Sequence, residues 1–246
     1  MHLMKTDKLK KFARSLADLL FPPICVACKA PIPARYGAFC ESCHREFART
    51  RLLPCRHCGR EMMHCTCVNE ALALAGMRRV AKVCPYYPDR KDSPELALLF
   101  AMKRRNVDAY RLFAAREIAA SVKRMMHSAD GFTVTYVPRK AASVREYGFD
   151  HAREISILVA KELGLEWEEL FCRTADAREQ KGLTAKERTK NASATLLPKD
   201  GAAAKGKRYI VCDDILTSGA SLAACAEILS ALGAKETVGA VFAARA

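Results

Sequence analysis

Most of the cysteines lie close together near the N-terminus, in pairs whose spacing suits a metal ion. Of the 12 cysteines in the chain, eight follow the spacing Cys-x-x-Cys three times and then Cys-x-Cys, at Cys25, Cys28, Cys40, Cys43, Cys55, Cys58, Cys65 and Cys67. Two residues between thiolates let a tight turn present both sulfurs to one ion, and two such turns complete a tetrahedral site. Because no export signal is recognised, we expect a reducing cytoplasmic compartment and bound zinc rather than disulfides.

The spacing leaves the number of zinc ions open. The first four cysteines predict one structural Zn²⁺ and the second four predict another, although Cys65 and Cys67 are close for two ligands of one ion, and His64 could replace one of them. The pairs could close in sequence order or interleave, and an iron–sulfur cluster or free thiols are the alternatives. Four thiolates leave no position for a substrate, so a structural role is expected. The other cysteines are expected in the apolar core: Cys84, Cys172, Cys212 and Cys225.

A second set of residues has the composition of a phosphate-binding turn. A β-rich run, Tyr209–Cys212, leads to the adjacent acids Asp213 and Asp214, after which small and hydroxylated residues open an apolar-periodic helix. Backbone N–H groups at a helix N-terminus attract phosphate, and glycine allows its close approach. The predicted phosphate-binding residues are Thr217, Ser218, Gly219, Ala220 and Ser221.

The two acids would repel a phosphate, so they are expected to serve another part of the ligand. Ribose hydroxyls or Mg²⁺-bound waters are natural recipients for Asp213 and Asp214. We expect both carboxylates to lie exposed in a loop after the strand. The simpler alternative is an ordinary helix cap preceded by two incidental acids.

The elements that would position these residues alternate between strands and helices. β-rich runs predict strands at 80–87, 132–137, 209–212 and 237–242, the first confined to a sheet edge by Pro85 and Pro88. Apolar periods predict one long or two joined helices over 96–126 and further helices at 149–163 and 221–232, with a polar loop at 180–191. The alternation predicts an α/β fold with a mostly parallel sheet covered by helices. Within 96–126 the expected inner face is Leu96, Leu99, Phe100, Leu112, Phe113 and Ile118.

A change of composition near Leu72 predicts two domains. Residues 1–71 would form a basic lead helix and a small zinc-ribbon-like module, and residues 72–246 the α/β domain. The lead segment Met1–Pro23 has helical apolar spacing, and could dock on the protein or on an anionic membrane surface. No apolar stretch reaches the length of a membrane span, so none is predicted.

The formal net charge of +14 predicts contact with polyanions. Basic residues cluster at Lys5–Arg14, Lys103–Arg105, Lys123–Arg124 and Lys181–Lys190. Each cluster alone is also compatible with a solvated face. Together they make nucleic acids and phosphorylated small molecules the expected partners.

Residues Ile210 to Ser221 resemble the phosphoribosyl-pyrophosphate motif of type I phosphoribosyltransferases. Together with the cysteine pairs, nearly the whole chain resembles the ComF family, the competence-associated proteins of bacterial DNA uptake. Further matching segments are Phe21 to Cys25, Val137-Pro138, Gly148-Phe149, Gln180 to Thr184, Glu187-Arg188, Asn191 and Gly233-Ala234.

This resemblance implies a fold of the type I phosphoribosyltransferase kind and a role for each motif residue. Asp213 and Asp214 would hold the ribose of phosphoribosyl pyrophosphate or of another ribose phosphate, with the 5′-phosphate in the turn 217–221. Arg139 and Lys140, after the strand at 132–137, would lie where this fold binds pyrophosphate. In the loop at 180–191, Lys181 and Arg188 would neutralise a departing pyrophosphate together with Mg²⁺.

One segment departs from the family pattern. The family usually has Arg-Gly-Phe-Asn-Gln where this chain has Tyr147-Gly148-Phe149-Asp150-His151. The missing arginine and amides weaken the transfer of any role to this segment. His151 is therefore expected to be a partly exposed residue at a helix start rather than a catalytic base.

Three functions from different classes remain open. The preferred one is an accessory protein of DNA uptake that binds ribose phosphate or single-stranded DNA and contacts other uptake proteins. The second is an active phosphoribosyltransferase of nucleotide salvage, a glycosyltransferase whose acceptor base the sequence does not identify. The third is an interaction scaffold with a vestigial phosphate turn, which the complete pair of acids and the hydroxyl-rich turn disfavour.

Overall fold

The computed structural model of the chain describes residues 22–33, 37–90, 92–174 and 195–245. Most of the lead segment and the loop at 180–191, with Lys181 and Arg188, lie outside the described residues. The elements in chain order are α2 (Glu41–Thr50), η2 (Met62–His64), α3 (Glu70–Leu74), β1 (Val80–Tyr86), α4 (Pro94–Arg104), α5 (Asp108–Met125), β2 (Phe132–Tyr136), α6 (Ala141–Tyr147), α7 (His151–Leu163), β3 (Glu166–Trp167), β4 (Phe171–Arg173), β5 (Leu196–Pro198), β6 (Arg208–Leu216), α9 (Ala220–Ala231) and β7 (Glu236–Arg245).

Five strands pair in the order β1-β7-β6-β2-β3, and every pairing between them is parallel. The predicted α/β class with a parallel sheet is therefore confirmed, and β1, which contains Pro85, lies at an edge as expected. Strand β6 is longer than predicted and includes Asp213 and Asp214. Asp213 pairs with Val241 of β7, and Asp214 lies between this pair and the next one, Ile215 with Ala243. The short strands β4 and β5 form a separate antiparallel pair.

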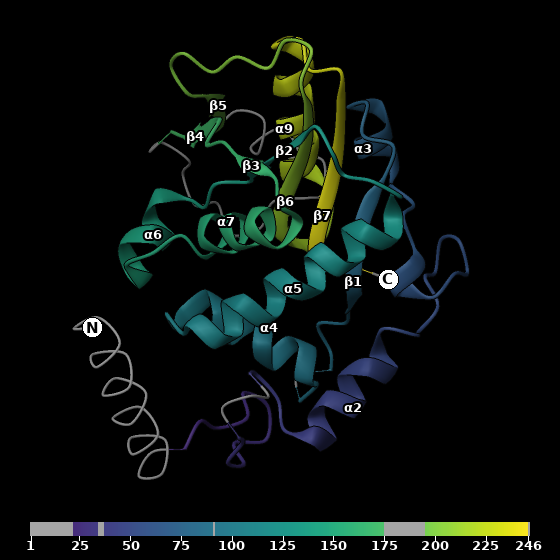
Figure 1. Cartoon of the computed structure of the whole chain (residues 1–246), viewed down its shortest axis with the longest axis vertical. Coiled ribbons are helices and arrows are strands. Elements are labelled where there is room, and N and C mark those ends of the chain that lie inside the picture. The colour runs from purple at the N-terminus through teal and green to yellow at the C-terminus, as the bar shows by residue number, and fades with distance from the viewer. Residues whose placement is uncertain (1–21, 34–36, 91, 175–194, 246) are drawn as a thin grey trace, which may run out of the picture.

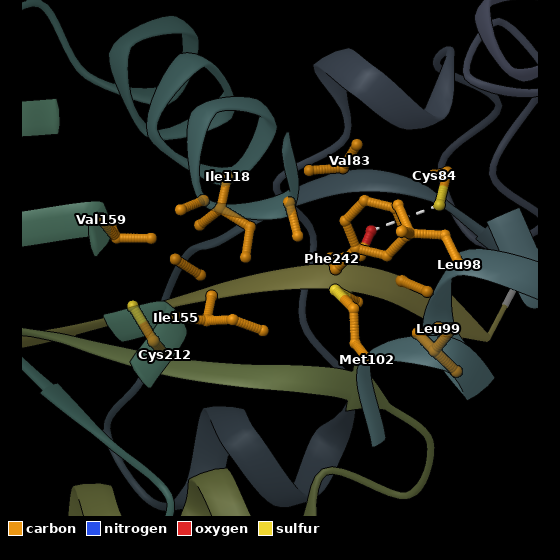
Figure 2. Close-up of a cluster of buried hydrophobic side chains, with 14 of the residues drawn as sticks. Val83, Cys84, Leu98, Leu99, Met102, Ile118, Ile155, Val159, Cys212 and Phe242 are labelled. Carbon is orange, nitrogen blue, oxygen red and sulfur yellow. Dashed lines mark hydrogen bonds between the residues drawn. The ribbon is translucent and has the colours of Figure 1, made fainter. Parts of the chain in front are cut away.

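The two faces of the sheet carry two separate cores, since neighbouring residues of a strand point to opposite faces. On β6, Ile210 and Cys212 belong to the core beneath α4, α5 and α7, whereas Tyr209 and Val211 belong to the core beneath α9 and α3 (Figure 1). Figure 2 shows part of the first core, where the thiol of Cys84 donates to the carbonyl of Phe242 over 3.3 Å. The carboxyl end of β6 is thereby fixed between two packed layers.

Several details of the helices differ from expectation. The segment 96–126 forms two helices, which is one of the two predicted arrangements. Phe100, expected on the inner face, is instead 43% exposed because the buried stripe of α4 runs through Leu98, Leu99 and Met102. Leu112 and Phe113 of α5 are only half-buried, as is Cys172, which was expected in the core. The predicted domain boundary at residue 72 falls inside α3. Within the described ranges, no helix is long and apolar enough to cross a membrane.

Candidate ligand-binding site and metal clusters

The eight N-terminal cysteines form two separate clusters that close in sequence order. Cys25, Cys28, Cys40 and Cys43 make the first, and Cys55, Cys58, Cys65 and Cys67 make the second, with the four sulfurs of each within 4.8 Å of one another. A tetrahedral zinc site with bonds of about 2.3 Å has sulfur–sulfur edges of about 3.8 Å. The edges found, 3.6 Å for Cys28–Cys40 and 3.7 Å for Cys55–Cys67, fit that size.

The short spacing of Cys65 and Cys67 left open whether both belong to one metal site or whether His64 replaces one of them. Both sulfurs belong to it, 3.3 Å apart, and His64 lies outside, with Nε2 at 3.9 Å from a carboxylate oxygen of Glu61. Burial alone would raise the pKa of Cys55, but the backbone N–H groups of His57 and Cys58 lower it to about 6. Four closely spaced sulfurs in each cluster support structural zinc in both.

Each cluster is built into one of the two cores. Cys25 and Cys43 pack with Phe39 and Phe47 in the core beneath α4 and α5, and Phe47 stacks on Phe242 of β7. Cys55 and Cys65 pack in the opposite core. There the Lys82 side chain of β1, only 5% exposed, donates to the Cys67 carbonyl at 2.7 Å and reaches Cys65 Sγ at 3.2 Å. Its charge offsets part of the negative charge of four thiolates.

A cleft of about 240 Å³ lies at the carboxyl end of β6. Asp213 and Asp214 line it from the strand, and Ser221 lines it from the start of α9. Its four cationic side chains come from three places in the chain: Lys103, the adjacent pair Arg139 and Lys140, and Arg173. Ligands of open α/β sheets bind at this edge, so the cleft is the candidate site.

The two acids have opposite electrostatic surroundings. Asp214 Oδ2 lies 2.5 Å from Nε2 of His151 and 3.1 Å from Nζ of Lys103. Although burial opposes it, these two partners lower the pKa of Asp214. Burial and the charge of Asp214 instead raise the pKa of Asp213 to about 8. At neutral pH the pair thus offers one carboxylate, held by Lys103 and His151, and one carboxyl that can donate a hydrogen bond.

The expectation of an exposed loop pair is therefore wrong. Both acids sit on strand β6, and the side chain of Asp214 is 13% exposed. His151 also differs from expectation because it is 2% exposed, and within the described chain its Nδ1 has no hydrogen-bond partner. It lies at the cleft because Asp150 caps α7, accepting from the N–H groups of Ala152 and Arg153, which starts the helix at this point.

Arg139 and Arg173 connect the two turns that border the cleft. Asp150 also accepts from the backbone N–H of Arg139 at 3.0 Å, which fixes the turn after β2 to α7. Arg173 donates to the Pro138 carbonyl at 2.7 Å and to Ser221 Oγ at 3.2 Å. One guanidinium thus holds the 138–140 turn and the 217–221 turn beside the same cavity.

The structure brings five of the predicted site residues together in the cleft lining and adds three, whereas residues 217–220 are not part of that lining. Asp213, Asp214, Arg139, Lys140 and Ser221 line one cleft, and Gly219 before it has φ +78°, a left-handed conformation that suits glycine. The sequence reasoning missed His151, Lys103 and Arg173 as site residues. Lys103 had been assigned to a basic surface cluster, whereas its ammonium group pairs with Asp214. Arg173 lies in a segment without a recognisable motif.

Comparisons with known proteins describe the two parts of the chain separately. Residues 16–84 match the double zinc ribbon domain family. Among curated protein sequences, none matches the chain. Similar solved structures include an allosteric regulatory enzyme of purine biosynthesis, with 19% identity, a TM-score of 0.38 and coverage of 58% of this chain and 30% of that one.

Two further similar structures are phosphoribosyltransferases. A hypoxanthine phosphoribosyltransferase from Staphylococcus aureus has 12% identity and a TM-score of 0.33, with 53% of this chain and 61% of that one covered. The adenine phosphoribosyltransferase from Leishmania tarentolae has 14% identity and a TM-score of 0.34, with 54% and 70% covered. The chain thus spans less than two thirds of the first two of these three proteins, and similarity at this level defines no activity for it.

Proposed function

We propose that the cleft binds a phosphorylated ribose, with phosphoribosyl pyrophosphate as the preferred ligand. The observation that carries this is the placement of an acid pair at the carboxyl end of a central parallel strand, between two turns that Arg173 joins. Asp213 and Asp214 suit ribose hydroxyls, because one can donate and the other can accept a hydrogen bond. The turn 217–221 at the start of α9 suits the 5′-phosphate.

The distribution of charge supports a ligand with more than one anionic group. Lys103 and His151 already balance Asp214, which leaves Arg139, Lys140 and Arg173 for the ligand. Arg139 and Lys140 lie in the turn that would face a pyrophosphate at the anomeric carbon. Mg²⁺ would enter with the pyrophosphate, whose oxygens are ligands that it prefers.

For the biological role we propose a ComF-like accessory protein of bacterial DNA uptake, with residues 1–71 as its zinc module and 72–246 as its ribose-phosphate domain. The zinc ribbon ahead of an α/β domain with this cleft supports that role, and the net charge of +14 supports contact with single-stranded DNA. Other DNA-uptake proteins would be its partners, in the cytoplasm.

An active phosphoribosyltransferase is the second candidate. The cations of the 138–140 turn favour it, because a departing pyrophosphate needs neutralisation in the transition state. On the family resemblance, Lys181 and Arg188 would add to that neutralisation. The chain's own groups would then bind and orient the ribose, and displacement at the anomeric carbon would follow from positioning and charge balance.

Calorimetric titration of phosphoribosyl pyrophosphate, with and without Mg²⁺, tests the proposal. We expect saturable binding by the wild type and a loss of at least about tenfold in affinity for Asp214→Asn, since charge-assisted hydrogen bonds contribute about 1.5–3 kcal/mol each. Adding nucleobases and assaying pyrophosphate release then separates the two candidates. Saturable binding without release favours the accessory role, and no binding by the wild type would refute both.

A further inference from the structure

The second cysteine cluster and the phosphate turn are joined by a single side chain. Asn69 follows Cys67 by two residues and stands at the N-cap of α3. Its Oδ1 accepts from the N–H of Leu72 at 3.1 Å, which caps the helix. Its Nδ2 donates to the carbonyl of Ser218 at 2.9 Å, across a separation of 149 residues. The amide therefore uses both ends, one for α3 and one for the turn.

The bond to Ser218 fixes the direction of the next backbone N–H. The Ser218 carbonyl and the Gly219 N–H belong to one planar trans peptide, in which the two groups point in opposite directions. Because the carbonyl points to Asn69, the Gly219 N–H points away from α3. The cleft lining includes Ser221 of α9 and, among the described residues, none of α3. Asn69 thus turns one N–H donor of the phosphate turn away from α3.

Close packing holds this contact in place. A β-carbon added to Gly219 would lie 3.1 Å from Asn69 Nδ2 and 3.1 Å from Leu72 Cγ, so the turn touches α3 directly. Leu72 is fully buried in the same core as Leu222 of α9. Figure 1 shows α3 beside α9 on this side of the sheet. The turn cannot shift toward α3 without a clash.

The cluster at the other end of this segment is fixed to the sheet. The ammonium group of Lys82 on β1 donates to the carbonyl of Cys67 at 2.7 Å, and it lies 3.2 Å and 3.5 Å from the sulfurs of Cys65 and Cys67. The backbone that carries Asn69 is therefore held by a thiolate cluster, which zinc would close, and by a buried lysine.

We propose that Asn69 is a positioning residue for the phosphate turn, and that the second cysteine cluster sets the affinity of the cleft for phosphate by holding Asn69. This rests on the proposed function, since it assumes that the turn binds a phosphate. It assigns the second cluster a role in ligand binding besides stability. A cap without this role would affect α3 alone.

The variant Asn69→Ser separates the two roles of the side chain. Serine is as good an N-cap as asparagine, but its hydroxyl is too short to reach Ser218, and it adds no charge. We expect unchanged zinc content and melting temperature, with affinity for ribose 5-phosphate about tenfold lower. In wild-type protein labelled with ¹⁵N-glycine, ribose 5-phosphate should shift the Gly219 amide signal, and this shift should shrink in the variant.

A pair of lysine variants tests the contribution of the cluster. Lys82→Met removes the donor to Cys67, and Lys29→Met removes an exposed lysine beside the first cluster, where Lys29 Nζ donates to the Val26 carbonyl at 2.6 Å. We expect Lys82→Met to release zinc to a chelator more readily and to bind ribose 5-phosphate at least about fivefold more weakly. Lys29→Met should bind it as the wild type does.

The outcomes distinguish this inference from the proposed function. If the wild type binds no ribose 5-phosphate and no phosphoribosyl pyrophosphate, both are refuted. If the wild type binds and Asn69→Ser binds equally well with an unchanged Gly219 shift, the positioning role is refuted and the ribose-phosphate site stands. Equal affinities for Lys82→Met and wild type, despite faster zinc loss, would refute the link to the cluster alone.

Discussion

The two cysteine clusters differ in how they are joined to the rest of the protein. The first packs its cysteines among aromatic side chains, in the core that also holds Leu98, Leu99 and Met102 of α4. The second is joined by directional hydrogen bonds, from Lys82 to Cys67 and from Asn69 to Ser218. Apolar packing tolerates small shifts, whereas a hydrogen bond fixes the orientation of one peptide. The same metal chemistry can therefore support the fold in one place and the geometry of a turn in another.

Each cluster also supports a different side of the cleft. Helix α4, which packs on the first cluster, supplies Lys103 to Asp214, on the side proposed for ribose. The segment after the second cluster supplies Asn69 to the turn proposed for phosphate. The comparison predicts that damage to the two clusters has different consequences for ligand binding.

The largest expected effects come from removing one zinc ligand in each cluster. Cys43→Ser and Cys65→Ser should each lower the zinc content from two ions per chain to one, and each should lower stability by on the order of several kcal/mol, because zinc binding contributes to folding energy. Only Cys65→Ser should also lose ribose 5-phosphate affinity by more than about tenfold at a temperature where both variants remain folded. Elemental analysis, urea unfolding and calorimetry measure the three quantities. Equal loss of affinity in both variants would contradict the comparison.

A smaller effect is expected at Asp214, where binding and stability are linked. Asp214→Asn leaves Lys103 and His151 without the carboxylate that holds them, so the variant should lose on the order of 2 kcal/mol of stability as well as ligand affinity. Asp213→Asn should instead gain stability at pH 7, because the folded protein holds this carboxyl protonated whereas the unfolded chain ionises it. Thermal melts and titrations of the two variants should therefore diverge. Identical melting temperatures would contradict the assigned ion pairs.

The residues of the basic cluster 103–105 are expected to have two different roles. Lys103 pairs with Asp214, whereas Arg104 and Arg105 are exposed. If single-stranded DNA binds this surface, the double change of Arg104 and Arg105 to Gln should reduce the slope of log affinity against log salt by about 1 or more, given about 0.7 per phosphate contact. Lys103→Met should leave that slope nearly unchanged and weaken ribose 5-phosphate binding. A larger slope change for Lys103→Met would place Lys103 with the DNA-binding residues.

Local patterns in the sequence predicted the fold class and the metal ligands well. Parallel strands, the edge position of β1 and the membership of Cys25 and Cys67 in clusters follow from alternation and spacing, which are properties of neighbouring residues. The contacts of Asp214 with His151 and Lys103 do not follow from local patterns, because they form only after three elements assemble. Asn69 was missed for the same reason.

The last expected effect, which appears only as a difference between two pH values, is the pH dependence of stability at Asp213. Burial and the charge of Asp214 raise its pKa to about 8 in the folded protein, whereas an unfolded aspartate titrates near about 4. Between these values the folded state binds more protons than the unfolded state, so this group lowers stability as pH rises. Asp214, whose pKa is lowered, changes the stability with pH only below about pH 4 and therefore not in this range. Urea unfolding at pH 5 and pH 8 should therefore show the wild type losing about 3 kcal/mol relative to Asp213→Asn over that interval, since one proton costs about 1.4 kcal/mol per pH unit between the two pKa values. The comparison with the variant cancels the pH dependence of the zinc thiolates, which both proteins share. Parallel pH profiles for the two proteins would mean that Asp213 is ionised in the folded state, and the cleft would then carry two negative charges at neutral pH.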